Sequence, residues 1–114
     1  APMSRGILAV VSAPLSAEAM AASDAQIRES WERAYAGQSF MVLLDPGTMP
    51  ATANVIGSNA AHIQVAVDRR AGRLIAMSAI DNLTRGTAGQ AVQSLNIALG
   101  LPEDQGLTPI GVAP

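Results

Sequence analysis

The stretch from Ile80 to Leu101 constrains the fold more than any other part of the chain. It leaves an apolar run, crosses a small-residue turn at Gly86 and continues at helical spacing to a glycine stop at Gly100. From Gly86 to Pro102 it holds no charged residue, whereas a surface helix ordinarily shows water a charged face. The pattern predicts a helix covered on more than one side. A neutral polar surface helix is the alternative.

Composition limits the rest of the fold. The chain has 114 residues, enough for one domain with a modest core, and its apolar residues are nearly all Ala, Val, Ile and Leu. Abundant β-branched residues and glycine suit a mixed α and β domain better than a helical bundle.

Charge and cysteine content exclude several classes of function. The net charge of −2 gives no electrostatic footprint for nucleic acid or an anionic membrane. No apolar run reaches the roughly 18–20 residues that a bilayer span needs, and no signal peptide is apparent. The chain has no cysteine and one histidine, so we expect no disulfide, no cysteine nucleophile and no metal site within it. The cytoplasm is the default compartment.

The N-terminal part predicts a buried strand and then a helix. Ile7–Val11 is apolar without alternation, which is typical of a strand covered on both faces. Opening on such a strand favours further polypeptide before it, although a short free N-terminus explains it as well. Ser23 and Gln26 form a capping-box pattern, and the following apolar residues recur at helical spacing up to Gly37. We interpret Trp31 and Tyr35 on this helix as core packing.

The middle of the chain predicts further strands. Residues 39–44 resemble a second buried strand, and residues 53–56 a short one. Residues 62–68 alternate strictly, which predicts a half-covered antiparallel strand with His62, Gln64 and Ala66 on its polar side. Residues 69–72 then form a hairpin loop, and residues 73–80 return as the partner strand. The order predicts an α+β fold with a mixed, largely antiparallel sheet and helices on one face.

Candidate chemistry gathers around the end of the last predicted strand. Asn82 offers a donor pair and an acceptor at once, which suits an amide-bearing ligand such as nicotinamide. The alternative is that Asp81 and Asn82 merely cap the helix. The glycines of residues 86–89 lack the lysine and spacing of a phosphate loop and favour close backbone packing. Arg5 can anchor a carboxylate or phosphate, or form an ordinary salt bridge. We weigh His62 as a general base and set it aside, because no acid or nucleophile is implied beside it.

Several stretches together resemble one enzyme family. The run IDNLTRGTAGQAVQSLN, residues 80–96, closely resembles the C-terminal helix motif of N-acetyl-gamma-glutamyl-phosphate reductases. Further agreement, in order, comes from Pro2-Met3-Ser4-Arg5-Gly6-Ile7, Val55-Ile56-Gly57-Ser58-Asn59 and Gly100-Leu101-Pro102, and the closing Gly111-Val112-Ala113-Pro114 resembles actinobacterial members. The resemblance covers essentially the whole chain. Aspartate semialdehyde dehydrogenases carry a related motif, and Arg85 stands where a lysine is commoner.

The resemblance implies an activity and a set of site residues. The family makes N-acetylglutamate 5-semialdehyde for arginine biosynthesis: a thiolate attacks the acyl phosphate, and NADPH then supplies a hydride. The family's cysteine and base histidine lie upstream of the part matched here, so we assign no catalytic residue and expect the chain alone to be inactive. Asn82 matches the position near the nicotinamide, with Gly86 and Thr87 close by. Arg5 is the candidate for contacting substrate.

The resemblance also implies a domain organisation. Residues 1–80 are expected to form the later part of the substrate and dimerisation domain of a glyceraldehyde-3-phosphate-dehydrogenase-like enzyme. Residues 81–101 are expected to return to a nucleotide-binding domain, and residues 102–114 to form an extended tail. The expected partners are that nucleotide-binding part and further copies in a dimer or tetramer, with no nucleic acid or membrane. The alternatives are a non-catalytic dimerisation module and the homologous part of an aspartate semialdehyde dehydrogenase.

Overall fold

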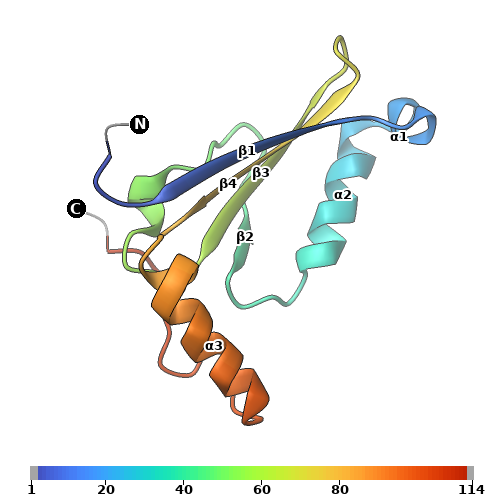
Figure 1. Ribbon diagram of the computed structural model, residues 1–114. Coiled ribbons are helices and arrows are strands. Elements are labelled where there is room, and N and C mark those ends of the chain that lie inside the picture. The colour runs from blue at the N-terminus through green and yellow to red at the C-terminus, as the bar shows by residue number, and fades with distance from the viewer. Residues whose placement is uncertain (1–2, 113–114) are drawn as a thin grey trace.

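A computed structural model describes residues 3–112 (Figure 1). Ala1, Pro2, Ala113 and Pro114 fall within the domain ranges and motifs considered above and lie outside the described residues. The strands, in chain order, are β1 (Ile7–Pro14), β2 (Met41–Leu43), β3 (Ala61–Asp68) and β4 (Arg73–Ile80). The helical elements are α1 (Ala17–Ala21), α2 (Asp24–Tyr35), the 3-10 turn η1 (Thr52–Val55), the π-helical turn η2 (Thr84–Ala88) and α3 (Gly89–Ala98).

The four strands form one mixed sheet in the order β1-β4-β3-β2. The pairs β1–β4 and β3–β4 are antiparallel, and β2 runs parallel to β3. The β3–β4 hairpin has the register expected from the sequence, with Asp68 opposite Arg73 across the loop. The predicted α+β class with a mixed, largely antiparallel sheet is therefore confirmed.

Helix α2 covers one face of the sheet, as Figure 1 shows. Its start is the predicted capping box, because Ser23 Oγ accepts from Gln26 N–H and Gln26 Oε1 accepts from Ser23 N–H. Trp31 and Tyr35 lie one helical turn apart with ring centroids 6.0 Å from each other. They border a hollow of about 230 Å³ over the sheet, whose floor includes Ala9, Val11, Ile63 and Ala76. Both aromatic residues are half-buried, so they pack on the sheet and remain partly exposed to solvent.

Strand β1 corrects one expectation. All eight of its residues are exposed, although the run Ile7–Val11 was expected to be covered on both faces. The reason is its position: β1 is an edge strand that pairs only with β4, and α2 packs chiefly on β2 and β3.

Two further expectations in the middle of the chain are wrong. Residues 53–56 were expected to form a strand, but Thr52–Val55 is a 3-10 turn that buries Val55. Gln64 was placed on the polar side of β3, yet it is almost fully buried, at 2% exposure. Just beyond the end of β2, the Gln64 side chain satisfies backbone groups that have no strand to pair with. Its Nε2 donates to the carbonyls of Asp45 and Thr48, and its Oε1 accepts from Val65 N–H.

Helix α3 projects beyond the end of the sheet instead of lying on it (Figure 1). Only Gly89 and Asn96 of this helix are buried, and the exposed apolar side chains of the segment are Val92, Leu95, Ile97, Leu99 and Leu101. The cover that the sequence predicts for this helix is not supplied by residues 3–112.

Candidate functional site at the end of strand β4

The carboxylate of Asp81 organises the first residues after β4. It is fully buried, and Arg5 approaches it with two nitrogens, Nε at 3.1 Å from Oδ1 and Nη2 at 2.7 Å from Oδ2. It also accepts backbone hydrogen bonds from Gly57 at 2.5 Å, from Leu83 at 2.8 Å and from Thr84 at 3.3 Å. One side chain thus ties together three segments that are remote in sequence.

These partners determine the charge of Asp81. Burial alone would raise the pKa of its carboxyl group, because a charged group loses its hydration. The Arg5 guanidinium and the backbone N–H donors outweigh burial and hold the pKa well below its usual range. Asp81 is therefore a permanently ionised structural group at neutral pH and is unsuited to carrying a proton.

Asn82, Gly86 and Thr87 lie together on the turn that Asp81 starts. Asn82 Oδ1 accepts from Gly6 N–H at 2.7 Å, and Thr87 Oγ1 donates to the Asn82 carbonyl at 2.8 Å. Gly86 N–H donates to the Asp81 carbonyl at 2.9 Å. The structure thus brings the three predicted cofactor residues into one cluster and joins Arg5 to them through Asp81. Asp81 also caps the turn through the N–H groups of residues 83 and 84, which was the alternative interpretation for that residue.

The cluster keeps polar groups available to a ligand. Asn82 is half-buried, and its Nδ2 makes no hydrogen bond within residues 3–112. Gly86 and Thr87 are exposed, and a Cβ at Gly86 would meet no atom nearer than 3.6 Å. An open amide donor beside a small, accessible turn is compatible with the carboxamide of a nicotinamide ring.

Nothing in the sequence indicated a second group of hydrogen-bonded polar side chains beside this cluster. Asn59 Nδ2 donates to Gln93 Oε1 at 2.9 Å, and Gln93 also bonds Arg85 and Glu103. Asn59 is fully buried, and its Oδ1 has no hydrogen-bond partner in the described part of the chain. The stretch Val55–Asn59 was noticed only for its resemblance, because nothing local predicts a contact with a residue 34 positions away.

The residues that follow α3 fold back onto the loop that precedes β3. Asn96 Nδ2 donates to the carbonyls of Glu103 and Gln105, which folds the chain back beside α3. Further on, Asn59 N–H donates to the Thr108 carbonyl and Val112 N–H to the Ile56 carbonyl, both at 2.8 Å. The segment after α3 is thereby anchored to the loop that also supplies Gly57 to Asp81.

His62 lies apart from this polar cluster. It sits on β3 opposite Ala79. Its Nδ1 is buried without a partner among residues 3–112, and burial lowers the pKa of its imidazole. No cluster of three or more His, Asp or Glu side chains in the described ranges is placed to hold a metal ion.

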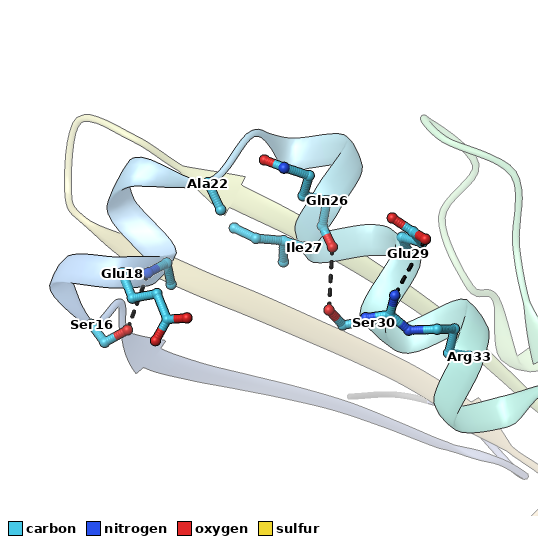
Figure 2. Close-up of a pocket in the computed structure, with 9 residues that line it drawn as sticks. Ser16, Glu18, Ala22, Gln26, Ile27, Glu29, Ser30 and Arg33 are labelled. Carbon is cyan, nitrogen blue, oxygen red and sulfur yellow. Dashed lines mark hydrogen bonds and ion pairs between the residues drawn. The ribbon is translucent and has the colours of Figure 1, made fainter.

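Two larger hollows flank α2 and contain none of the predicted site residues. One, of about 430 Å³, lies between α2 and the end of β3. The other, of about 420 Å³, lies between α1 and α2 (Figure 2). Figure 2 shows that its polar groups bond their own neighbours: Arg33 pairs with Glu29, Ser30 with the Gln26 carbonyl and Ser16 with Ala19 N–H.

The fold and site together define a class: an α+β sheet domain whose strand-end Asp-Asn pair leads into an uncharged helix. The chain belongs to the semialdehyde dehydrogenase dimerisation-domain family, whose pattern matches residues 1–82. No helix within residues 3–112 is both long and apolar enough to cross a bilayer.

Curated relatives give a finer comparison. The chain is 71% identical over 114 residues to the N-acetyl-gamma-glutamyl-phosphate reductase of Bifidobacterium longum strain DJO10A, covering 100% of this chain and 31% of the relative. It is 67% identical over 113 residues to the enzyme of that name from Bifidobacterium animalis subsp. lactis, covering 99% and 31%. For Streptomyces avermitilis the identity is 58% over 114 residues, covering 100% and 32%. The resemblance found in the sequence is confirmed, and the chain spans about a third of the length of these relatives.

Proposed function

We propose that this chain is the C-terminal part of an NADP-dependent reductase that converts N-acetyl-gamma-glutamyl phosphate to N-acetylglutamate 5-semialdehyde in arginine biosynthesis. The observation that carries the proposal is 71% identity along all 114 residues to reductases of that name. The 114 residues contain no cysteine, so the nucleophile of the acyl transfer must come from the rest of the enzyme. The chain alone is expected to be inactive, and we place the enzyme in the cytoplasm.

We propose NADP as the cofactor, held by Asn82, Gly86 and Thr87. When bound, it supplies the hydride. Asn82 uses its oxygen to accept from Gly6 N–H, which leaves the amide nitrogen to donate to the carboxamide of the nicotinamide. Gly86 is exposed and has no side chain, so a ligand can approach its backbone closely.

We propose that Arg5 contacts the substrate's phosphate or carboxylate. Two of its nitrogens are engaged by Asp81, but 35% of its side chain is exposed and Nη1 has no partner among residues 3–112. A guanidinium already fixed by a buried carboxylate loses little freedom when it binds an anion. Asp81 thereby acts as a positioning residue for Arg5.

We propose the domain organisation that the resemblance implies. Residues 1–80 form the later part of the substrate and dimerisation domain, residues 81–101 pack on the nucleotide-binding part, and residues 102–114 form the tail. The exposed apolar side chains of α3 support the second assignment, because Leu95 and Ile97 are 57% and 60% exposed in this chain. The sheet face opposite α2, with Leu8 and Val10 on it, suits packing between copies in a dimer or tetramer.

The activity is tested on the full-length enzyme that contains this chain. It should oxidise NADPH with N-acetyl-gamma-glutamyl phosphate and be far slower with aspartyl phosphate. Preference for aspartyl phosphate would make it an aspartate semialdehyde dehydrogenase. A correctly assembled protein that turns over neither acyl phosphate would favour a non-catalytic module.

The cofactor site is tested by a nearly isosteric change. Asn82→Asp keeps the oxygen that accepts from Gly6 and removes the amide donor, so the fold should persist while NADPH affinity falls by about tenfold. Asn54→Asp is the matched control, because Asn54 is exposed and the change adds the same charge. Equal NADPH affinity in the two variants, measured by nucleotide fluorescence, would remove Asn82 from the site.

A further inference from the structure

We propose that residues 108–112, which we call the C-terminal strap, position Arg5 for the anionic group of the substrate. The strap holds the peptide group between Ile56 and Gly57, and that group in turn donates a hydrogen bond to the Asp81 carboxylate. The inference rests on the proposed function, because it takes Arg5 as the residue that contacts substrate. It makes the strap a positioning segment that acts through other groups of the chain.

The residues that the strap holds form a tight turn. Ser58 N–H donates to the Val55 carbonyl at 3.1 Å. Between them, Ile56 has φ −57° and ψ 130°, and Gly57 has φ +77°. These are the angles of a type II turn, in which glycine takes the position with positive φ. A type I turn differs from it chiefly in its central peptide group, which faces the opposite way. The peptide group between Ile56 and Gly57 therefore has two orientations available to it.

This one peptide group joins the strap to the Asp81 carboxylate. Its carbonyl, that of Ile56, accepts from Val112 N–H at 2.8 Å. Its N–H, that of Gly57, donates to Asp81 Oδ2 at 2.5 Å. Because a trans peptide group is planar, its C=O and N–H point in opposite directions and can only turn together. The bond from Val112 that fixes the carbonyl therefore also aims the N–H at Asp81.

The oxygen that Gly57 contacts also holds Arg5. Arg5 Nη2 lies 2.7 Å from Asp81 Oδ2. If the peptide group were reversed, the Ile56 carbonyl oxygen would face this carboxylate in place of the N–H. Both groups only accept hydrogen bonds, so they would repel each other. The reversed turn would therefore displace the carboxylate, together with the guanidinium bound to it.

The strap reaches the turn through its backbone. Besides the bond from Val112 N–H, the Thr108 carbonyl accepts from Asn59 N–H at 2.8 Å. Between these two bonds, a Cβ at Gly111 would lie 2.6 Å from the Asn54 carbonyl oxygen. Only glycine lets the strap approach the turn this closely. The orientation of the turn thus depends on two backbone bonds and one close contact, all made by residues 108–112.

Removing the Val112 N–H tests the inference in the full-length enzyme. Val112→Pro deletes the donor to the Ile56 carbonyl, and Val112→Ala, which keeps that donor, is the matched control. We expect Val112→Pro to raise the KM for N-acetyl-gamma-glutamyl phosphate about fivefold, because the group that binds the substrate's anion is loosened. The kcat and the KM for NADPH should stay within about twofold. Equal KM values for the acyl phosphate in the two variants would overturn the inference.

Two glycines of the same tail give an independent pair of variants. Gly111→Ala forces the strap away from the Asn54 carbonyl, whereas a Cβ at Gly106 meets no atom within 4 Å. Gly106 has φ +75°, so Gly106→Ala strains the tail without reaching the turn. We expect the KM for the acyl phosphate to rise in Gly111→Ala and to stay within about twofold in Gly106→Ala. The same rise in both variants would show that lost stability controls the KM, and would overturn the inference.

Hydrogen exchange of the Gly57 amide reports on the turn without any turnover. We expect this amide, followed by NMR in the full-length enzyme, to exchange at least about tenfold faster in Val112→Pro than in Val112→Ala. Equal rates would overturn the inference, and an enzyme that still reduces its acyl phosphate would leave the proposed function standing. Arg5→Lys separates the two further. If it raises the KM for the acyl phosphate and Val112→Pro does not, the strap inference alone fails. If Arg5→Lys leaves that KM unchanged, the substrate contact of Arg5 fails and the inference with it.

Discussion

The cluster around Asp81 and helix α3 lie within a few residues of each other and have opposite physical characters. Asp81 is fully buried, charged and bonded by Arg5 and three backbone N–H groups, all within this chain. Helix α3 is uncharged and exposes Val92, Leu95 and Ile97 to solvent. The Asp81 carboxylate finds its hydrogen-bond and ion-pair partners within the chain, whereas the apolar side chains of α3 are not covered by residues 3–112. The geometry of the Asp81 cluster is therefore set within the chain, whereas the apolar side chains of α3 are left uncovered by it.

Removing the central carboxylate should have the largest effect. Asp81→Ala leaves Arg5 without its partner and several N–H groups without an acceptor, so we expect a loss of at least about 3 kcal/mol in the free energy of unfolding. Urea unfolding of the 114-residue chain, followed by the fluorescence of its single tryptophan, Trp31, measures it. Asp104→Ala, at an exposed position, should stay within about 0.5 kcal/mol of the unchanged chain. Similar losses in both variants would mean that the cluster is not a stabilising centre.

Acid should weaken the same cluster without any mutation. The folded chain holds the Asp81 pKa below its ordinary value of 3.8, so the unfolded state binds the proton more readily. The stabilisation is complete above that ordinary value and is lost as the pH falls below it toward the folded pKa. We expect the free energy of unfolding to fall between pH 5 and about pH 2, with a shallower fall in Asp81→Asn. Identical slopes in the two chains would show that other carboxyl groups cause the loss.

The junction between the two regions tests how tightly α3 is attached. A Cβ at Gly89 would overlap Asn59 Oδ1 and lie 2.9 Å from the Thr84 carbonyl, so Gly89→Ala should cost about 2 kcal/mol. Gly86→Ala is the matched control three residues earlier, where the nearest atom to a Cβ is 3.6 Å away. It should be neutral, or more stable by up to about 1 kcal/mol, because alanine favours helix. Equal costs for the two alanines would contradict the close contact with Asn59.

The elements that the sequence predicted are those with local signals. The signals for the capping box before α2, for strand β3 and for the hairpin loop each lie within a few residues, and each of these elements was found where expected, although burial along β3 does not alternate. The exposure of β1 was not predictable, because strand order depends on pairings across the whole chain. Gln64 was misplaced for a related reason: its burial follows from β2 ending at Leu43, which no pattern around Gln64 reveals.

Some features of the candidate site were likewise predictable from local sequence, and others depend on contacts between residues far apart in the chain. The Asp-Asn pair was recognisable as a polar strand end, and Arg5 as a cation entering a strand. Their contact joins residues 76 positions apart, so local patterns left it open whether Arg5 bound a ligand or a carboxylate. Asn59 escaped notice because its partner Gln93 lies on another element, and a buried amide without a local partner has no signature in a sequence.

The smallest expected effect on the stability of the 114-residue chain comes from a change on the exposed face of α3. It tests most directly how α3 differs from the Asp81 cluster. Leu95 is 57% exposed, so Leu95→Gln should change the free energy of unfolding of the 114-residue chain by no more than about 0.5 kcal/mol. In the full-length enzyme the same change would place an amide between α3 and the nucleotide-binding part, and we expect the Tm to fall by several degrees. Gln90→Glu, at an exposed position without an apolar side chain, serves as the control in both chains. If Leu95→Gln is as harmless in the long enzyme as in the short chain, α3 has no protein partner, and its lack of charge needs another cause.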